Sequence, residues 1–188
     1  MGYHSAHSIQ TLYNLGQHDM PTLHERIETT LPLAETFAFV GDFANAVAWD
    51  PGVADSQRLD DGPIGVGSRY QLAVRMAGRM APMAYTVTAY ELDRRVVLHG
   101  SGSGVEAEDA IDFGADGGRT VIDYPATIRL LGIRRLVEPF LGGTFRRIAR
   151  DARDGMQAAL DRRVAMALPS SAVPPPVDRS NEATQAAT

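Results

Sequence analysis

The sequence contains no cysteine and no lysine, and each absence excludes a kind of chemistry. Without cysteine there can be no disulfide, thiolate metal ligand, thiol nucleophile or cysteine-bound iron–sulfur cluster. All 18 positions counted as Lys or Arg are arginine, so a Schiff base between a lysine and a carbonyl substrate or pyridoxal phosphate is also excluded. We expect no cofactor, because no other motif in the sequence predicts one.

Long apolar runs are missing as well. No stretch approaches the roughly 20 apolar residues that a membrane-spanning helix needs. No positively charged segment followed by an apolar core is visible near residue 1, so a cytoplasmic location is the default expectation. The formal net charge of −5 argues against a general nucleic-acid-binding surface. The five histidines form no spaced cluster in the predicted folded region, and no metal site is predicted.

The length of 188 residues suits one domain with a tail at each end. Residues 1–21 show no sustained periodicity, and residues 168–188 are rich in proline and polar side chains. Both segments are predicted to be flexible tails. The folded domain is predicted to span residues 22–167, and no oligomeric state is predicted.

Hydrophobic periodicity predicts an α+β chain. Alternation of apolar and polar residues predicts strands at 22–31, 53–59, 66–76, 80–92, 95–100, 105–113 and 119–130. Helical spacing predicts helices at 33–40 and 43–49, and over most of 132–167 with a break near Gly142. Because short links between strands require antiparallel neighbours, we expect a strongly curved antiparallel sheet. This sheet would wrap the long helix, and the two short helices would close one end.

The long helix carries an apolar stripe that needs a surface to lie on. Its members recur three to five residues apart: Leu136, Phe140, Phe145, Ile148, Ala149, Ala152, Met156, Ala159 and Leu160. Full burial of each large side chain contributes roughly 1.5–3 kcal/mol, whereas an isolated helix of this length is marginal in water. The stripe is therefore predicted to face the concave side of the sheet.

Four local sequences accompany this order of elements: Trp49-Asp50-Pro51, Pro63-Ile64-Gly65-Val66-Gly67-Ser68-Arg69, Arg94-Arg95-Val96-Val97 and Gly118-Arg119-Thr120. Together they resemble the START/Bet v 1-like (SRPBCC) superfamily over about residues 22–163, and most of all its polyketide cyclase/dehydratase and lipid-transport group. The resemblance implies a helix-grip fold of about seven strands. It also implies a cavity between sheet and helix for a lipid, polyketide or other small apolar molecule. Some members cyclise or dehydrate polyketides, but no residue set here matches a catalytic signature of the family.

The residues predicted to face the interior mix large aromatic side chains with alanine. Ala89, Ala107 and Ala126 leave room beside the aromatic groups, and a ligand pocket of roughly 300–1,000 Å³ with a few polar groups is the expected form. Tyrosine hydroxyls and the Trp49 N–H would be those polar groups. The alternative is that the same side chains simply fill a core. The predicted ligand-binding residues are Trp49, Tyr70, Leu72, Tyr85, Val87, Asp109, Phe113, Tyr124, Phe140 and Phe145.

Asp109 is the sharpest candidate for chemistry, because it is a carboxylate in the middle of an apolar strand face. Burial would raise its pKa and suit it to general acid–base catalysis, with Tyr85 or Tyr124 polarising a substrate carbonyl. A strand edge, a bulge or an arginine partner, Arg75 or Arg129, would explain it structurally instead. Three functions stay open: first, binding of a small apolar molecule; second, a cyclase/dehydratase-type enzyme that uses Asp109 and tyrosine; third, a protein-interaction module.

Overall fold

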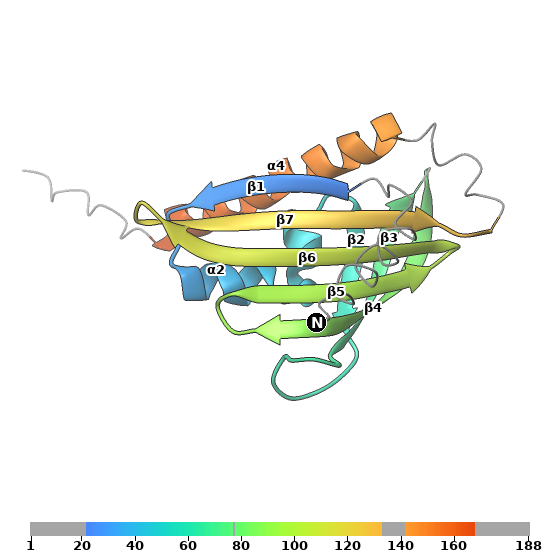
Figure 1. Cartoon of the computed structure of the whole chain (residues 1–188), viewed down its shortest axis with the longest axis horizontal. Helices are drawn as coiled ribbons and strands as arrows, with labels where there is room; N and C mark the ends of the chain where they lie inside the picture. The colour runs from blue at the N-terminus through green and yellow to red at the C-terminus, as the bar shows by residue number, and fades with distance from the viewer. Residues whose placement is uncertain (1–21, 77, 133–141, 168–188) are drawn as a thin grey trace, which may run out of the picture.

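The computed structural model describes residues 22–76, 78–132 and 142–167 (Figure 1). Its seven strands are β1 Thr22–Thr29, β2 Val53–Arg58, β3 Arg69–Met76, β4 Arg79–Glu91, β5 Arg95–Gly102, β6 Val105–Asp116 and β7 Arg119–Leu130. Its helices are α2 Leu33–Val40, the 3-10 helix η1 Phe43–Asn45, α3 Ala46–Trp49 and α4 Gly142–Ala167. The predicted α+β helix-grip fold and its order of elements are confirmed. The tails predicted at 1–21 and 168–188 lie outside the described residues.

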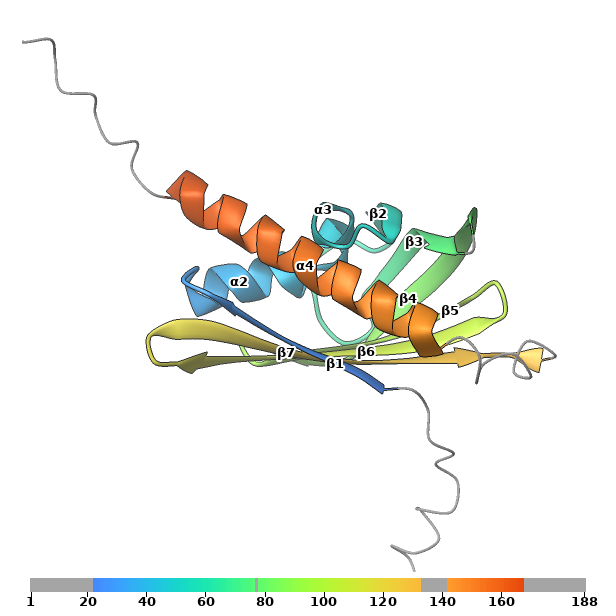
Figure 2. The same ribbon diagram turned by 90° about the horizontal axis from the view of Figure 1, so that it is seen from above.

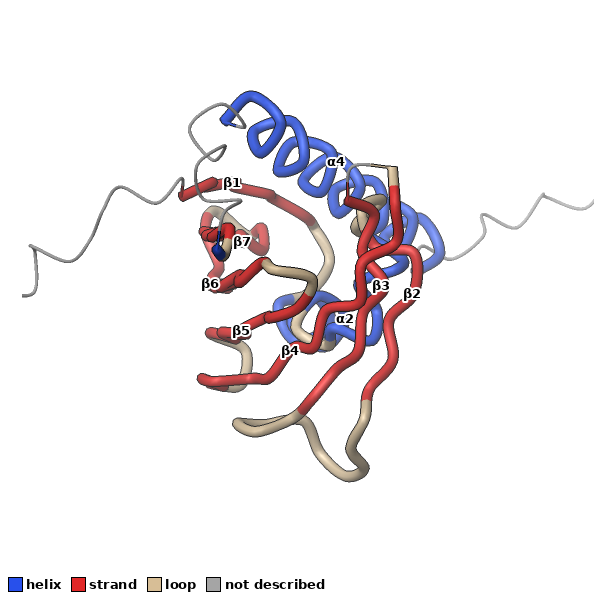
Figure 3. The backbone as a smooth tube through the Cα atoms, turned by 90° about the vertical axis from the view of Figure 1, so that its right-hand side faces the viewer, coloured by secondary structure: helices blue, strands red, loops and turns tan. Residues whose placement is uncertain are grey.

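The strands form one antiparallel sheet in the order β1-β7-β6-β5-β4-β3-β2. Consecutive strands from β2 to β7 are neighbours in this meander, with links of only two or three residues from β3 onward, and β1 adds to the free edge of β7. Figures 2 and 3 show that the sheet curls, that α4 crosses its open side, and that α2 lies within the curl. The fold therefore has an interior between the concave face of the sheet and α4, and side chains from both line it.

The apolar stripe of α4 is buried over only part of its length. Met156, Ala159 and Leu160 are at most 3% exposed, but Ile148, which was predicted to belong to the same stripe, is 41% exposed. Helix α4 packs mainly on β1 and α3, and its first turns reach beyond the start of β1 (Figures 1 and 2). The prediction for Ile148 was wrong because helical periodicity shows which face is apolar, not how far the covering surface extends.

One strand departs from simple alternation. Strand β4 has an extra residue between Val87 and Ala89 relative to β5, and such a bulge exchanges the inward and outward positions beyond it. Tyr90, which strict alternation would place on the outer face, therefore lies on the inner side, partly buried, and packs edge-on against Phe37, with ring centroids 5.4 Å apart. Ala89, predicted to face inward, takes the outward position. One of the three alanines expected to leave room in the interior is thus not there.

Helix α4 approaches α3 closely because Gly155 has no side chain. A Cβ atom at Gly155 would overlap the carbonyl oxygen of Trp49 and lie 2.8 Å from Cδ of Pro51. About two turns later on the same helix, Arg162 donates a 3.4 Å hydrogen bond to the carbonyl of Ala48. These contacts hold the end of α3, and with it the tryptophan, against the covering helix.

A second link ties α4 to the sheet. Glu25 lies on the inward side of β1. Its carboxylate is 3.7 Å from Nε of Arg153 on α4. Because both side chains are partly exposed, this pair contributes at most about 1 kcal/mol.

Candidate functional site

Asp109 is the centre of the candidate site. It lies on the concave face of β6, opposite Ala126 of β7, and only 9% of its surface is exposed. The hydroxyl of Tyr124 donates a 2.9 Å hydrogen bond to its Oδ1 atom. Alternation in the two strands points both side chains inward, and the β6–β7 register brings them together. Asp109 and Tyr124, two of the three predicted catalytic residues, are thus in direct contact, and their catalytic role stays a prediction.

The arginine partners that were considered for Asp109 are engaged elsewhere. Arg75 donates a 2.8 Å hydrogen bond to the carbonyl of Pro51. Arg129 faces Glu106 across 4.0 Å on the outer side of the sheet. Asp109 also lies in the middle of the sheet rather than on an edge strand. Its hydrogen-bond partner is tyrosine rather than arginine, so the structural explanations based on an arginine or an edge are wrong.

Burial raises the pKa of Asp109 to about 6, because a charged carboxylate is poorly solvated there. The negative charges of Asp50 and Glu108 act in the same direction, whereas hydrogen bonding by Tyr124 and Tyr85 lowers the pKa. Burial also raises the pKa of both tyrosines well above the usual value. Near neutral pH the carboxyl group can therefore gain or lose a proton, while the two phenols remain hydrogen-bond donors.

Tyr85 reaches this group because a glycine lies opposite it. In the β4–β5 ladder Tyr85 pairs with Gly100, and a Cβ atom at Gly100 would overlap ring atoms Cε1 and Cζ of the tyrosine. The ring is also packed against Phe43, with centroids 5.5 Å apart. A larger residue at Gly100 would push the phenol out of its place beside the carboxyl group.

The end of α3 supplies the other side of the site. The Trp49 side chain is 2% exposed, and its ring meets that of Tyr124 edge-on at 6.3 Å. Asp50 follows it and accepts a 2.7 Å hydrogen bond from the backbone N–H of Gly52, while burial raises the pKa of its carboxyl group. No role at the site was predicted for Asp50 from the sequence. Its position next to the only tryptophan of the sequence was the available signal.

The remaining predicted ligand-binding residues divide into three groups. Tyr70, Leu72 and Val87 are at most 2% exposed and belong to the continuous core. Phe113 is buried too, but it packs edge-on against Phe37 of α2, with centroids 5.0 Å apart. Phe140 lies outside the described residues, and so does the side chain of Phe145. Their assignment to a ligand site remains a prediction.

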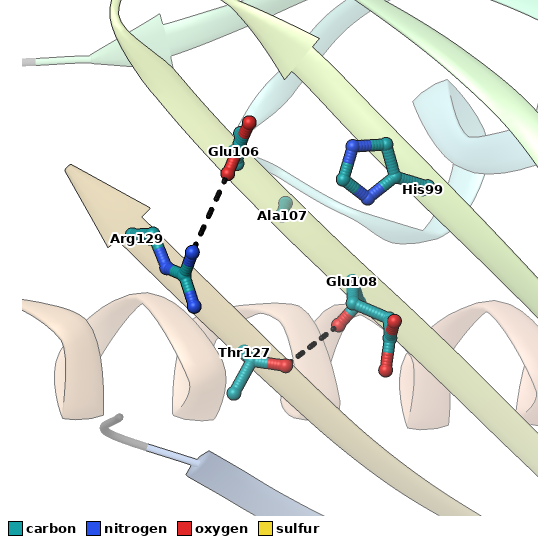
Figure 4. A pocket seen from close by; sticks show the side chains of 6 residues that line it. All are labelled: His99, Glu106, Ala107, Glu108, Thr127 and Arg129. Atoms are coloured by element: carbon teal, nitrogen blue, oxygen red, sulfur yellow. Dashed lines mark hydrogen bonds and ion pairs between the residues drawn. The ribbon is translucent and has the colours of Figure 1, made fainter. Parts of the chain in front are cut away.

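Two surface depressions lined by described residues lie on the outer face of the sheet, not between the sheet and α4. One encloses about 160 Å³ and is lined by His99, Glu106, Ala107, Glu108, Thr127 and Arg129 (Figure 4). The other encloses about 240 Å³ over β1, β6 and β7. Neither depression includes Asp109 in its lining.

The sequence itself matches a known family over nearly the whole of the described fold. The model of the family described as polyketide cyclase/dehydrase and lipid transport matches residues 20–163. The chain belongs to this family. Among curated proteins, none matches the sequence.

Solved structures share the fold of this family member at low sequence identity. The protein TTHA0849 from Thermus thermophilus is 12% identical, with a TM-score of 0.64 over 79% of this chain and 100% of its own. The Zhui aromatase/cyclase from Streptomyces sp. R1128 is 12% identical, with a TM-score of 0.60 over 76% of this chain and 94% of its own. A START superfamily protein from Mycobacterium smegmatis is 15% identical, with a TM-score of 0.59 over 77% of this chain and 97% of its own.

The part of the chain that the structure describes lacks two kinds of feature: a metal-binding group and a membrane-spanning helix. No group of three or more His, Asp or Glu side chains in residues 22–76, 78–132 and 142–167 is placed to hold a metal ion. In the same ranges no helix is both long and apolar enough to cross a membrane.

Proposed function

We propose that this chain binds a small hydrophobic molecule between the concave face of the sheet and α4, beside Asp109. Family membership and the helix-grip fold support the proposal. The observation that carries it is the buried carboxyl group with its tyrosine donor. Leaving a carboxyl group in a core costs stability, and groups of this kind gather where a ligand needs them.

The ligand would enter at the end of the molecule where α4 begins. Side chains of the first turns of α4, including Arg146, Arg147 and Ile148, are exposed. The end of β7 and the turns joining β3 to β4 and β5 to β6 lie at the same end (Figures 1 and 2). Because the firmly buried part of α4 is its second half, the first half can separate from the sheet at lower cost.

Native mass spectrometry of the chain purified from its own host tests this proposal. We expect one small molecule per chain. The molecule should be lost in Ala126→Phe, which places a ring beside Asp109 on the concave face. Thr127→Phe places the same ring on the outer face and is the matched control, in which the molecule should stay bound. Equal loss or equal retention in both variants would contradict an interior site.

A second candidate function is an enzyme of the cyclase or dehydratase kind. The observation that favours it is the raised pKa of Asp109, about 6, together with its tyrosine donor. The carboxylate would remove a proton from the carbon next to a substrate carbonyl, while Tyr85 or Tyr124 donates to the carbonyl oxygen. The protonated carboxyl group would then return that proton to a departing hydroxyl, releasing water. The third function, a protein-interaction module, stays a prediction that no observation on the described residues favours.

Turnover of a defined β-hydroxyketone substrate by Asp109→Asn separates the enzyme from the carrier. An enzyme that works through Asp109 should lose at least about a hundredfold in rate while binding the substrate as before. An unchanged rate in the folded variant would remove Asp109 from the mechanism.

A further inference from the structure

The indole N–H of Trp49 is a buried donor that nothing in the described structure uses. Its Nε1 atom is inaccessible to solvent and has no hydrogen-bond partner among the described residues, and the side chain as a whole is 2% exposed. An indole N–H can only donate, and buried donors almost always have an acceptor. This donor is therefore available to a bound molecule.

Aromatic rings surround the indole of Trp49. Its ring meets Phe43 edge-on at 5.8 Å and Tyr124 edge-on at 6.3 Å. Phe43 in turn packs against Tyr85 at 5.5 Å. A planar ring system bound beside them could add aromatic contacts of the same edge-on or offset kind, which a flexible alkyl chain cannot make.

The charges nearby are negative. Asp50 directly follows Trp49, and its charge raises the pKa of Asp109, Tyr85 and Tyr124. Tyr124 already donates to Asp109. A carboxylate or phosphate on the ligand would face two acidic side chains in a medium that screens poorly. A neutral oxygen acceptor would meet a free donor instead.

We propose that the interior site selects a neutral, planar ring compound whose ketone-type oxygen accepts the N–H of Trp49, and that it discriminates against anionic lipids. This proposal rests on the proposed interior binding function and adds the chemical class of the ligand. It assigns the selection to one atom of Trp49, supported by the carboxyl groups of Asp50 and Asp109.

Three compounds with one skeleton test the selection: fluorene, 9-fluorenone, which adds one carbonyl, and 9-fluorenone-4-carboxylate, which adds a charge. Calorimetric titration of the wild-type chain should show 9-fluorenone binding about tenfold more tightly than fluorene, as expected for one added hydrogen bond. The carboxylate should bind at least about tenfold more weakly than 9-fluorenone. In Trp49→Phe the preference for 9-fluorenone over fluorene should fall to less than about twofold.

A second measurement needs no variant. The single tryptophan gives one indole N–H resonance, which should move downfield with 9-fluorenone and not with fluorene. Equal affinity for fluorene and 9-fluorenone, or a preference that survives in Trp49→Phe without the downfield shift, overturns the selection and leaves interior binding standing. Failure of both compounds to bind, with no small molecule seen by native mass spectrometry, overturns the proposed function and the selection together.

Discussion

The hydroxyl of Tyr124 donates a 2.9 Å hydrogen bond to Oδ1 of Asp109, and this bond joins strands β7 and β6 on the concave face of the sheet. The donor is a neutral phenol, so it does not cancel the charge of the carboxylate. The bond nevertheless stabilises the charged carboxylate more than the neutral acid, because a carboxylate is the stronger acceptor. It is therefore the main local influence that opposes the effect of burial on Asp109.

Replacing the donor should move the titration of Asp109. In Tyr124→Phe the carboxylate loses its hydrogen bond, so the pKa of Asp109 should rise above its wild-type value of about 6. NMR titration of the Asp109 side-chain carbon measures this directly. Tyr90→Phe removes another partly buried phenol, one that packs on Phe37, and should leave the titration unchanged. A pKa that falls in Tyr124→Phe would mean that the hydroxyl does not stabilise the carboxylate.

Asp109 should make folding less favourable as the pH rises. Its pKa is about 6 in the folded chain against an ordinary value of 3.8, so the folded state binds the proton more tightly than the unfolded state. Below about pH 4 both states are protonated and the group has no effect. Between about pH 4 and 6 stability is lost, and the loss reaches about 3 kcal/mol above pH 6.

Urea unfolding of the wild-type chain and Asp109→Asn at pH 4 and pH 8 tests this linkage. The variant keeps an oxygen acceptor for Tyr124 and has no charge, so its advantage in the free energy of unfolding should grow by up to about 3 kcal/mol between the two pH values. The contributions of other titrating groups to stability are the same in both proteins, so they cancel when the variant is compared with the wild type at each pH. Glu108→Gln, on the exposed face of the same strand, should show little change. An advantage that shrinks with rising pH would contradict the assignment.

Gly155 should be intolerant of a side chain. Gly155→Ala places a methyl group against the Trp49 carbonyl and Pro51, and we expect a loss of about 1–3 kcal/mol in the free energy of unfolding. Gly143→Ala is the matched control on the same helix, because a Cβ atom there meets nothing within 4 Å. It should be neutral or stabilising by up to about 1 kcal/mol. Similar effects of both substitutions in chemical denaturation would refute the close approach of α4 to α3.

A side chain at Gly100 should displace the ring of Tyr85. Gly100→Ala puts a methyl group into the tyrosine ring, so it should destabilise the fold by about 1–3 kcal/mol and move the phenol away from Asp109. Gly114→Ala in β6 has open space around its Cβ position and should have little effect. Thermal unfolding of both variants measures the loss of stability, and the ring resonances of Tyr85 report whether the phenol has moved. An equal loss of stability in both variants would indicate that the strands do not tolerate substitution in general, and would contradict a specific overlap with Tyr85.

Much of this architecture could be predicted because alternation is a strong signal. Alternation alone placed Asp109 and Tyr124 on the apolar faces of their strands. It failed at Tyr90, because the extra residue between Val87 and Ala89 leaves no mark on the composition of the strand. The exposure of Ile148 depends on where β1 begins in space, which the helix sequence does not contain.

The candidate site was less predictable than the fold. The pairing of Asp109 with Tyr124 depends on the register between two strands, and register follows from the whole sheet rather than from either strand. The unpaired N–H of Trp49 is a property of its neighbours in space. The role of Asp50 beside the same site depends on where α3 ends in the fold.

The most direct test of the central claim uses the single tryptophan as a reporter of the interior. The chain is titrated with Nile red, a neutral apolar dye, while the emission of Trp49 is recorded. Binding in the interior predicts a saturable, one-to-one decrease in Trp49 emission that Ala126→Phe abolishes and Thr127→Phe preserves. Dye binding that leaves Trp49 emission unchanged, or that responds equally to both substitutions, would contradict a ligand site between the sheet and α4.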